Sequence, residues 1–285
     1  MSAGATPVAI GDDAGREKLL RAVAAAGDRP VALAEAALAL ATAERPRVDP
    51  GRYLDHLAIL ARDIAADARG ARAVGDRVAA LNAVFVGKYG YAGDQLTYDD
   101  LQNANLMRVI DRRKGLPVAL GILYIHGARA QGWPVCGIAF PGHFLVQLEA
   151  AGERAIIDPF NGGRVRTAPD LRALLKTMSG AAAELSPEHY APVSDRQVLL
   201  RLQNNVKLRL VRNREIERAL RTLDGMLLFA PDHAALWREA ALLRAHLGNY
   251  RAAIAALGEF IEREEAAEAR HEAAALLQQF KTRLN

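Results

Sequence analysis

Two residues, His143 and Asp158, have the types and the spacing for acid–base chemistry. Residues 143–149 and 154–158 read as two strands joined by a short turn. If the turn is centred on Ala150 and Ala151, His143 faces Asp158 directly across the hairpin, whereas a three-residue loop turns Asp158 to the other face. A carboxylate bonded to one imidazole nitrogen orients the ring and raises its basicity, which is half of a nucleophilic triad. The alternative is a buried pair that only joins two strand ends.

The nucleophile of such a triad is missing from its usual place. The helix predicted before these strands begins at Leu116, Pro117 and Val118 and ends near Gly132, and its start has no Cys, Ser or Thr. A thiolate there would be stabilised by the helix dipole. The one cysteine, Cys136, falls on the strand before His143, on the order of 15 Å away along paired strands. We therefore expect Cys136 to be a small buried hydrophobe.

A few polar residues could surround a cleft beside His143. Tyr98, Asn103, Asn105 and Asn161 are the candidates. Asn103 and Asn105 are unusual inside a helix, because short amides compete for backbone hydrogen bonds. They could instead be ordinary helix-terminal or surface amides. No cofactor or metal site is expected.

The elements that must position these residues are an α-helical cover and a small sheet. Residues 17–27, 31–43, 50–64 and 73–86 have the apolar spacing of helices, and they carry no chemistry of their own. The turn Phe140-Pro141-Gly142-His143 fits type II, with Gly at its third position. Thr167 and Asp170 predict a capping box at the start of a helix over 169–178.

Three motifs together resemble the SirB-type bacterial family. They are Arg113-Lys114-Gly115-Leu116-Pro117, Phe140-Pro141-Gly142-His143-Phe144-Leu145 and Asp158-Pro159-Phe160-Asn161-Gly162-Gly163, and the likeness extends from about Ala36 onward. The resemblance implies a papain-like or transglutaminase-like α+β core, followed by tetratricopeptide repeats. Transglutaminase-like enzymes use a Cys–His–Asp triad. His143 and Asp158 match its His and Asp, whereas Pro117 or a neighbour occupies the position of the Cys, and this departure argues against thiol chemistry.

The C-terminal part has a repeat of its own. Ile216, Ala219 and Leu223 recur 34 positions later as Tyr250, Ala253 and Leu257. This is the period of the tetratricopeptide repeat, a helix–turn–helix unit that can form a groove for a peptide, or can simply be a helical cap. The expected organisation is a disordered tail at 1–15, a transglutaminase-like domain with its helical cover at 16–180, a linker at 181–195 and repeats at 196–285.

Composition excludes several classes of protein. The 37 Lys and Arg against 33 Asp and Glu are spread along the chain, without the concentrated patch that nucleic-acid binding needs. The sequence predicts neither a secretory signal nor a membrane span, and a single cysteine fits a reducing compartment, so we expect a cytoplasmic protein.

Two hypotheses about function follow. In the first, a transglutaminase-like core without its thiol is joined to repeats at 196–285 that bind a protein or peptide partner. In the second, the protein is a hydrolase or acyl-transfer enzyme in which His143 and Asp158 activate water or a substrate nucleophile. An opening of the His143 ring to a site with hydrogen-bond donors would favour the second hypothesis.

Overall fold

The computed structural model describes residue 10 and residues 12–284. It divides into two compact units, one comprising the chain up to Leu19 and Ala26–Leu202, the other Leu20–Ala25 and Gln203 onward. Most of the expected disordered tail lies outside the described residues, and helix α1 (Asp13–Ala26) begins inside its range. In the described part of the chain, no helix is long and apolar enough to cross a membrane.

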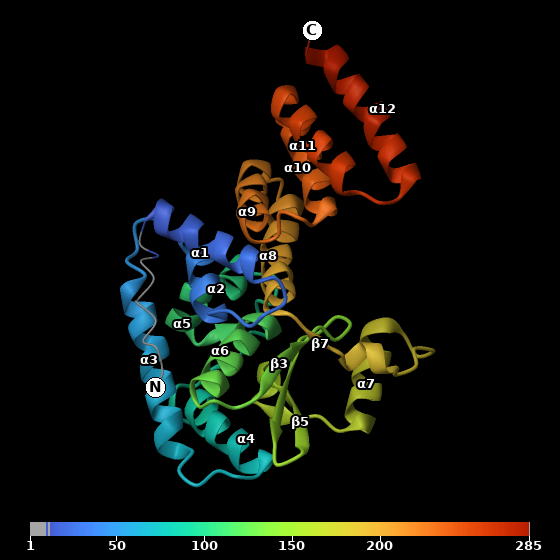
Figure 1. Ribbon diagram of the computed structural model, residues 1–285. Coiled ribbons are helices and arrows are strands. Elements are labelled where there is room, and N and C mark those ends of the chain that lie inside the picture. Colours follow the sequence, from blue (N-terminus) through green and yellow to red (C-terminus); the bar gives the residue numbers. More distant parts are fainter. Residues whose placement is uncertain (1–9, 11, 285) are drawn as a thin grey trace. The chain divides into compact units, whose positions relative to one another are not determined.

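The first unit is an α+β domain built around one five-stranded antiparallel sheet, which confirms the predicted fold class (Figure 1). The strand order is β6-β5-β4-β3-β7. Their bounds are Val135–Ile138 for β3, Leu145–Ala150 for β4, Glu153–Asp158 for β5, Arg164–Val165 for β6 and Pro192–Val193 for β7. Strand β7 comes from the segment that was expected to be a linker, because Pro192 and Val193 pair with Ile138 and Gly137.

The central helix α6 (Pro117–Ala130) packs on one face of this sheet. Its residues are almost all buried, which fits a helix that is apolar on every side. Gly121 lets the sheet approach, since a Cβ atom there would lie 2.4 Å from Cε1 of Phe144. On the other face, helix α7 (Ala168–Ser179) buries Leu171 and Leu175 against Ile138 and Leu145. The capping box of Thr167 and Asp170 at the start of α7 is confirmed.

Other helices surround α6. They are α2 (Leu33–Thr42), α3 (Gly51–Asp67), α4 (Val74–Asn82) with a π-helical continuation at Ala83–Lys88, and α5 (Leu106–Arg112). Short strands β1 (Ala92–Gly93) and β2 (Lys114–Gly115) pair in parallel just before α6. Asp195, at the start of α8 (Asp195–Arg212), accepts hydrogen bonds from both Nη atoms of Arg129 at 2.6 and 2.8 Å, so the first turn of α8 is fixed to α6.

The register of the β4–β5 hairpin corrects one prediction. Ala150 pairs with Glu153, so the loop is Ala151-Gly152 and not Ala150-Ala151. Both loop residues have positive φ, 51° and 80°, as a two-residue type I′ turn requires, and glycine takes such a φ without strain. The shift moves Asp158 out of direct opposition to His143. His143 itself lies in the turn before β4, where its N–H donates to the carbonyl of Phe140 at 3.0 Å.

The second unit contains helix pairs with the predicted 34-residue spacing. Helices α9 (Ile216–Phe229) and α11 (Tyr250–Arg263) begin 34 residues apart and bury Ala219, Leu223, Ala253 and Leu257 completely. Between and after them come α10 (Ala234–His246) and α12 (Ala267–Leu284). At the boundary between repeats, the carbonyl of Pro231 accepts from Nε1 of Trp237 at 2.7 Å and from Nε of Arg263 at 2.9 Å.

Candidate functional site: a buried His–Asp pair without a nucleophile

The His143 and Asp158 side chains are in contact. Nε2 of His143 lies 2.9 Å from Oδ1 of Asp158, and the side chains are 6% and 0% exposed. By the ladder register Asp158 is opposite the position of Leu145, so the pair is diagonal rather than direct. Diagonal neighbours on one face are close enough for long or aromatic side chains to meet. The sequence correctly predicted that His143 and Asp158 are in contact, but the two residues are diagonal neighbours and not directly opposite each other.

Asp158 is surrounded by hydrogen-bond donors. Its Oδ2 accepts from Nη2 of Arg166 at 2.6 Å, from Nε of Arg166 at 3.0 Å and from Nδ2 of Asn161 at 2.8 Å. The backbone N–H of Asn161 donates to Oδ1 at 3.2 Å. Burial by itself would raise the pKa of Asp158, but the hydrogen bonds from His143, Asn161 and Arg166 outweigh it and lower the pKa to about 2. The carboxylate is therefore ionised near neutral pH.

An ionised Asp158 fixes the tautomer of His143. Because a carboxylate only accepts hydrogen bonds, Nε2 must carry the proton and Nδ1 of the neutral ring keeps its lone pair. Among the described residues nothing forms a hydrogen bond with Nδ1. The ring meets Phe160 edge-on, with 5.9 Å between ring centroids, and Phe160 meets Tyr98 in the same way at 5.8 Å. The chemical capacity of the pair is that of an oriented general base.

Arg201 fixes the turn that carries His143. Its Nη2 donates to the carbonyl of His143 at 2.7 Å and to that of Phe140 at 3.1 Å. Sequence reasoning missed both Arg201 and Arg166, the second partner of Asp158. Arg201 lies on α8, far along the chain, and one arginine among many on a predicted helix carries no local signal.

The start of α6 is linked to this pair through β2, β1 and Phe160, and it offers the pair no nucleophile. Strand β2, which leads into α6, pairs with β1, and Gly93 of β1 packs so closely on Phe160 that an added Cβ would lie 2.5 Å from the ring. Phe160 in turn contacts His143. Pro117 is the first residue of α6, follows the N-cap Leu116 and is buried. Neither it nor Val118 has a group that could attack a substrate.

Cys136 does not fill the gap. It lies on β3 opposite Gln147, and its thiol is half-buried. Burial, together with the charge of Glu149, raises the pKa of this thiol. A protonated thiol on a sheet strand is a poor nucleophile. The sequence predicted a buried residue here, whereas the structure leaves Cys136 half-buried at the surface of the sheet.

The four cleft candidates separate into two pairs. Asn161 and Tyr98 lie near the His–Asp pair, through the contacts of Asn161 with Asp158 and of Tyr98 with Phe160. Asn103 is completely buried, accepts from Nη1 of Arg112 at 2.9 Å and donates to the carbonyl of Thr97 at 2.6 Å. Asn105 caps α5 and donates to the carbonyl of Ala41 at 3.1 Å. Asn103 and Asn105 thus hold the loop before α6 in place.

A second polar cluster was not predicted and lies around His56. Nε2 of His56 is 2.9 Å from the Tyr91 hydroxyl and 2.7 Å from Nη1 of Arg113. The Arg113 guanidinium lies over the rings of Tyr89 and Tyr91, at 5.4 and 4.8 Å from their centroids. Burial, and then the charge of Arg113, lower the pKa of His56 to about 4. This imidazole is therefore neutral near pH 7.

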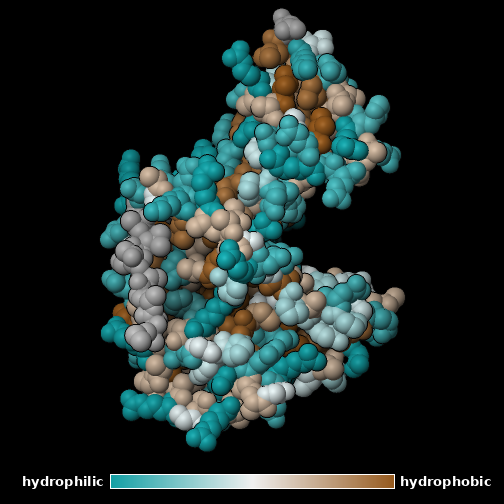
Figure 2. Space-filling model, in the orientation of Figure 1, coloured by the Kyte–Doolittle hydropathy of each residue, from teal (hydrophilic) through white to brown (hydrophobic). Residues whose placement is uncertain are grey.

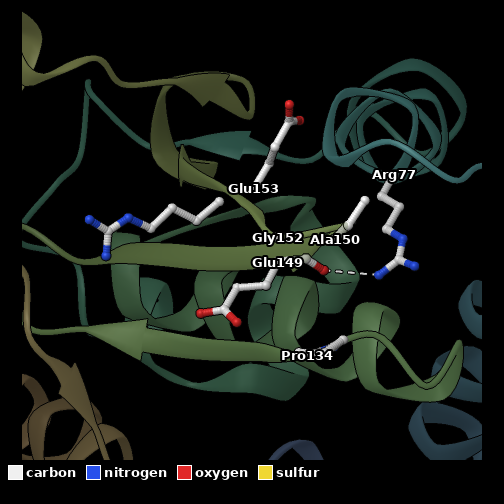
Figure 3. Close-up of a pocket in the computed structure, with 8 residues that line it drawn as sticks. Arg77, Pro134, Glu149, Ala150, Gly152 and Glu153 are labelled. Atoms are coloured by element: carbon white, nitrogen blue, oxygen red, sulfur yellow. Dashed lines mark hydrogen bonds between the residues drawn. The ribbon is translucent and has the colours of Figure 1, made fainter.

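An open pocket of about 610 Å³ lies at the tip of the β4–β5 hairpin (Figure 3). In it, Nη1 of Arg77 donates to the carbonyl of Glu149 at 2.9 Å, and Glu153 and Arg154 contribute further charges. It contains none of the candidate residues of the His–Asp site. Within residues 10 and 12–284, no group of three or more His, Cys, Asp or Glu could hold a metal ion.

Known proteins match both units. Residues 51–204 match the family model of the transglutaminase-like superfamily, and residues 206–278 match that of the tetratricopeptide repeat. A UPF0162 protein of Vibrio cholerae is 35% identical over 187 residues, which are 65% of this chain and 69% of the relative. A UPF0162 protein of Xylella fastidiosa is 30% identical over 237 residues, covering 81% and 83%. Protein SirB1 of Salmonella typhimurium is 28% identical over 183 residues, covering 64% and 68%.

Among solved structures, one of menin superposes with a TM-score of 0.43 at 12% identity, over 92% of this chain and 73% of menin. That likeness is too low to support any inference. The matches to the two family models follow the same order along the chain as the sheet domain and the helix pairs. With its transglutaminase-like core and its tetratricopeptide region, the chain belongs to the UPF0162/SirB1 family.

Proposed function

We propose that the protein is a non-catalytic transglutaminase-like protein that acts by binding a partner protein through its C-terminal repeats. The observation that carries the proposal is Pro117, which occupies the start of α6 where a triad of this kind needs a thiol. A buried proline has no group to ionise, and Cys136 is on another strand with a raised pKa. The His143–Asp158 pair is then retained because it joins the turn before β4 to the end of β5.

The repeats support the binding half of the proposal. Tetratricopeptide units stack helix pairs into curved surfaces, and proteins commonly use these surfaces to hold peptides. Neither a nucleic acid nor a membrane is proposed as the partner, because the charges of the chain are mixed along its length.

Cross-linking in the full chain tests this proposal. Wild-type protein and the His143→Gln variant would be used as baits in extract of the source organism, and the cross-linked residues would be mapped by mass spectrometry. We expect both baits to capture the same partner, with cross-links on residues 203–284. Loss of the partner in the His143→Gln bait, or cross-links confined to residues before 203, would contradict the proposal.

The second candidate function is hydrolysis or acyl transfer by the His143–Asp158 pair. One observation favours it: the ring of His143 is oriented by an ionised carboxylate, and its Nδ1 forms no hydrogen bond with any residue that the structure describes. Such a nitrogen can accept a proton from water or from a substrate hydroxyl. Hydrolysis of a panel of p-nitrophenyl esters that disappears in His143→Gln but survives in Cys136→Ser would establish it. The proposal of a non-catalytic role predicts no His143-dependent turnover.

A further inference from the structure

The first helices of successive repeats lie side by side. Each repeat begins with one helix of the series α8, α10 and α12. The ammonium group of Lys207 on α8 pairs with Glu239 on α10, and Nη2 of Arg238 on α10 lies 3.6 Å from Glu272 on α12. Two successive ion pairs between neighbouring helices indicate that α8, α10 and α12 form one continuous layer in the second unit.

The layer exposes leucines at one repeated position. Leu208 on α8, Leu242 on α10 and Leu276 on α12 are spaced by 34 residues. Leu208 is 52% exposed, Leu242 is 45% exposed and Leu276 is half-buried, and Val211 adds a further 39% exposed side chain one turn from Leu208. Single exposed leucines are normal on a protein surface, but a repeated position across three adjacent helices makes a continuous apolar strip. We call Leu208, Leu242 and Leu276 the leucine stripe.

Apolar residues are visible among the hydrophilic ones on the surface of the C-terminal helices (Figure 2). Helix α10 shows the same pattern in its sequence. Its core side buries Leu236, Ala240 and Ala241, yet Leu242 faces outward. A surface helix usually has polar residues on the face opposite its core side, so the exposed Leu242 departs from that pattern.

The charges beside the leucine stripe are not balanced. Its two acidic neighbours, Glu239 and Glu272, are each already paired with a cation of the same layer. Arg212, one helical turn beyond Leu208, is exposed, and within the described chain no carboxylate pairs with it. His246 occupies the equivalent place one turn beyond Leu242. The end of the stripe is therefore open to an anionic group.

We infer that the leucine stripe binds a peptide segment of a partner protein whose apolar side chains meet Leu208, Leu242 and Leu276 and whose carboxylate pairs with Arg212. This inference rests on the proposed function and adds the chemistry of the partner to it. Burial of the exposed leucines supplies affinity, and the ion pair fixes the direction in which the peptide lies. A basic peptide would be repelled at Arg212.

The test is selection of a displayed library of random peptides on the full chain, followed by fluorescence anisotropy with the labelled consensus peptide. We expect the selected peptides to combine apolar residues with an Asp, a Glu or a free C-terminal carboxylate. Leu242→Asp should weaken binding about tenfold or more, because a central apolar anchor is replaced by a charge. Leu247→Asp, a change of the same kind at a leucine outside the stripe, should leave the affinity unchanged.

Charge reversal provides the sharper arm of this test. Arg212→Glu should weaken binding of the acidic peptide. A peptide with Lys in place of its acidic residue should bind the Arg212→Glu variant but not the wild type. Selection of basic peptides that still depend on Leu242 would overturn the inference and leave the proposed function standing. Failure to select any peptide, with no partner cross-linked to residues 203–284, would overturn both. A dimer in sedimentation that Leu242→Asp converts to monomer would overturn the inference in favour of a second copy as occupant.

Discussion

Nε2 of His143 lies 2.9 Å from Oδ1 of Asp158, although Asp158 stands diagonally across the hairpin and opposite Leu145. The contact is held from both sides. Arg166 and Asn161 hold Asp158, while Arg201 holds the backbone turn that carries His143. An arrangement with so many supports has a structural value of its own, whether or not it also takes part in a reaction.

Asp158→Asn should destabilise the first unit strongly. The substitution removes the charge that pairs with Arg166, whose side chain is 14% exposed. Leaving a buried charge without its partner typically costs about 3–5 kcal/mol. Urea unfolding followed by circular dichroism measures the change in the free energy of unfolding. A loss below about 1 kcal/mol would show that the carboxylate is not a structural support.

The pH dependence of the same variant provides its control. The pKa of Asp158 is lowered to about 2 in the folded state, below the value near 3.9 of an unfolded chain. Its stabilising contribution is therefore complete above about pH 4 and is lost as the pH falls toward 2. Wild type should lose about 2 kcal/mol more than Asp158→Asn over that interval. Parallel losses in the two proteins would contradict this assignment.

Substitution of two helical glycines by alanine should change the free energy of unfolding in opposite directions. A Cβ at Gly121 would lie 2.4 Å from Cε1 of Phe144, so Gly121→Ala must displace an aromatic ring in the core and should cost about 1–3 kcal/mol. Gly258 in α11 has nothing within 4 Å of an added Cβ, and Gly258→Ala should raise the free energy of unfolding by about 0.5–1 kcal/mol. Thermal unfolding of both variants is the measurement. A stabilised Gly121→Ala would mean that α6 does not pack this closely on the sheet.

Much of this architecture could be predicted from the sequence. Apolar spacing located α6 and its neighbours, and the 34-residue recurrence from Ile216 to Tyr250 located the repeats, because both are local patterns. The predicted hairpin loop, Ala150-Ala151, lies one residue before the observed loop, Ala151-Gly152. The sequence did not decide between them, because the observed loop requires Ala151 to take a positive φ, which is uncommon for alanine. Arg166 and Arg201 could not be predicted, because their roles depend on tertiary contacts that leave no spacing rule.

His56 should titrate near pH 4. Burial and the Arg113 charge lower its pKa to about 4, below the value of about 6.5 in an unfolded chain. The neutral ring therefore stabilises the fold fully above about pH 6.5, and this contribution is lost as the pH falls toward 4. Because His56 is only half-buried, we expect a loss of about 1–2 kcal/mol. Two-dimensional NMR of the imidazole protons gives the midpoint, and a midpoint above pH 6 would rule out this environment. In the His56→Gln variant, the free energy of unfolding should change less between pH 6.5 and pH 4 than in wild type.

Pro117→Cys should create a reactive thiol. A cysteine at the first position of α6 would lie at the helix N-terminus, which favours the thiolate, and β2, β1 and Phe160 connect this position with His143. In a Cys136→Ser background, iodoacetamide should alkylate it faster at pH 7 than it alkylates Cys136 in wild type. The rate should fall when His143→Gln is added. Equal rates with and without His143 would show that α6 and the pair do not share one site.

The most direct test of the central claim is one binding experiment on three full-length proteins. Wild type, His143→Gln and Leu242→Asp would be compared by anisotropy with the selected peptide, after circular dichroism confirms that each is folded. A role in partner binding predicts that His143→Gln keeps the wild-type affinity and that Leu242→Asp loses about tenfold or more. The opposite pattern, with binding lost in His143→Gln and kept in Leu242→Asp, would place the function in the His143–Asp158 site and contradict the account.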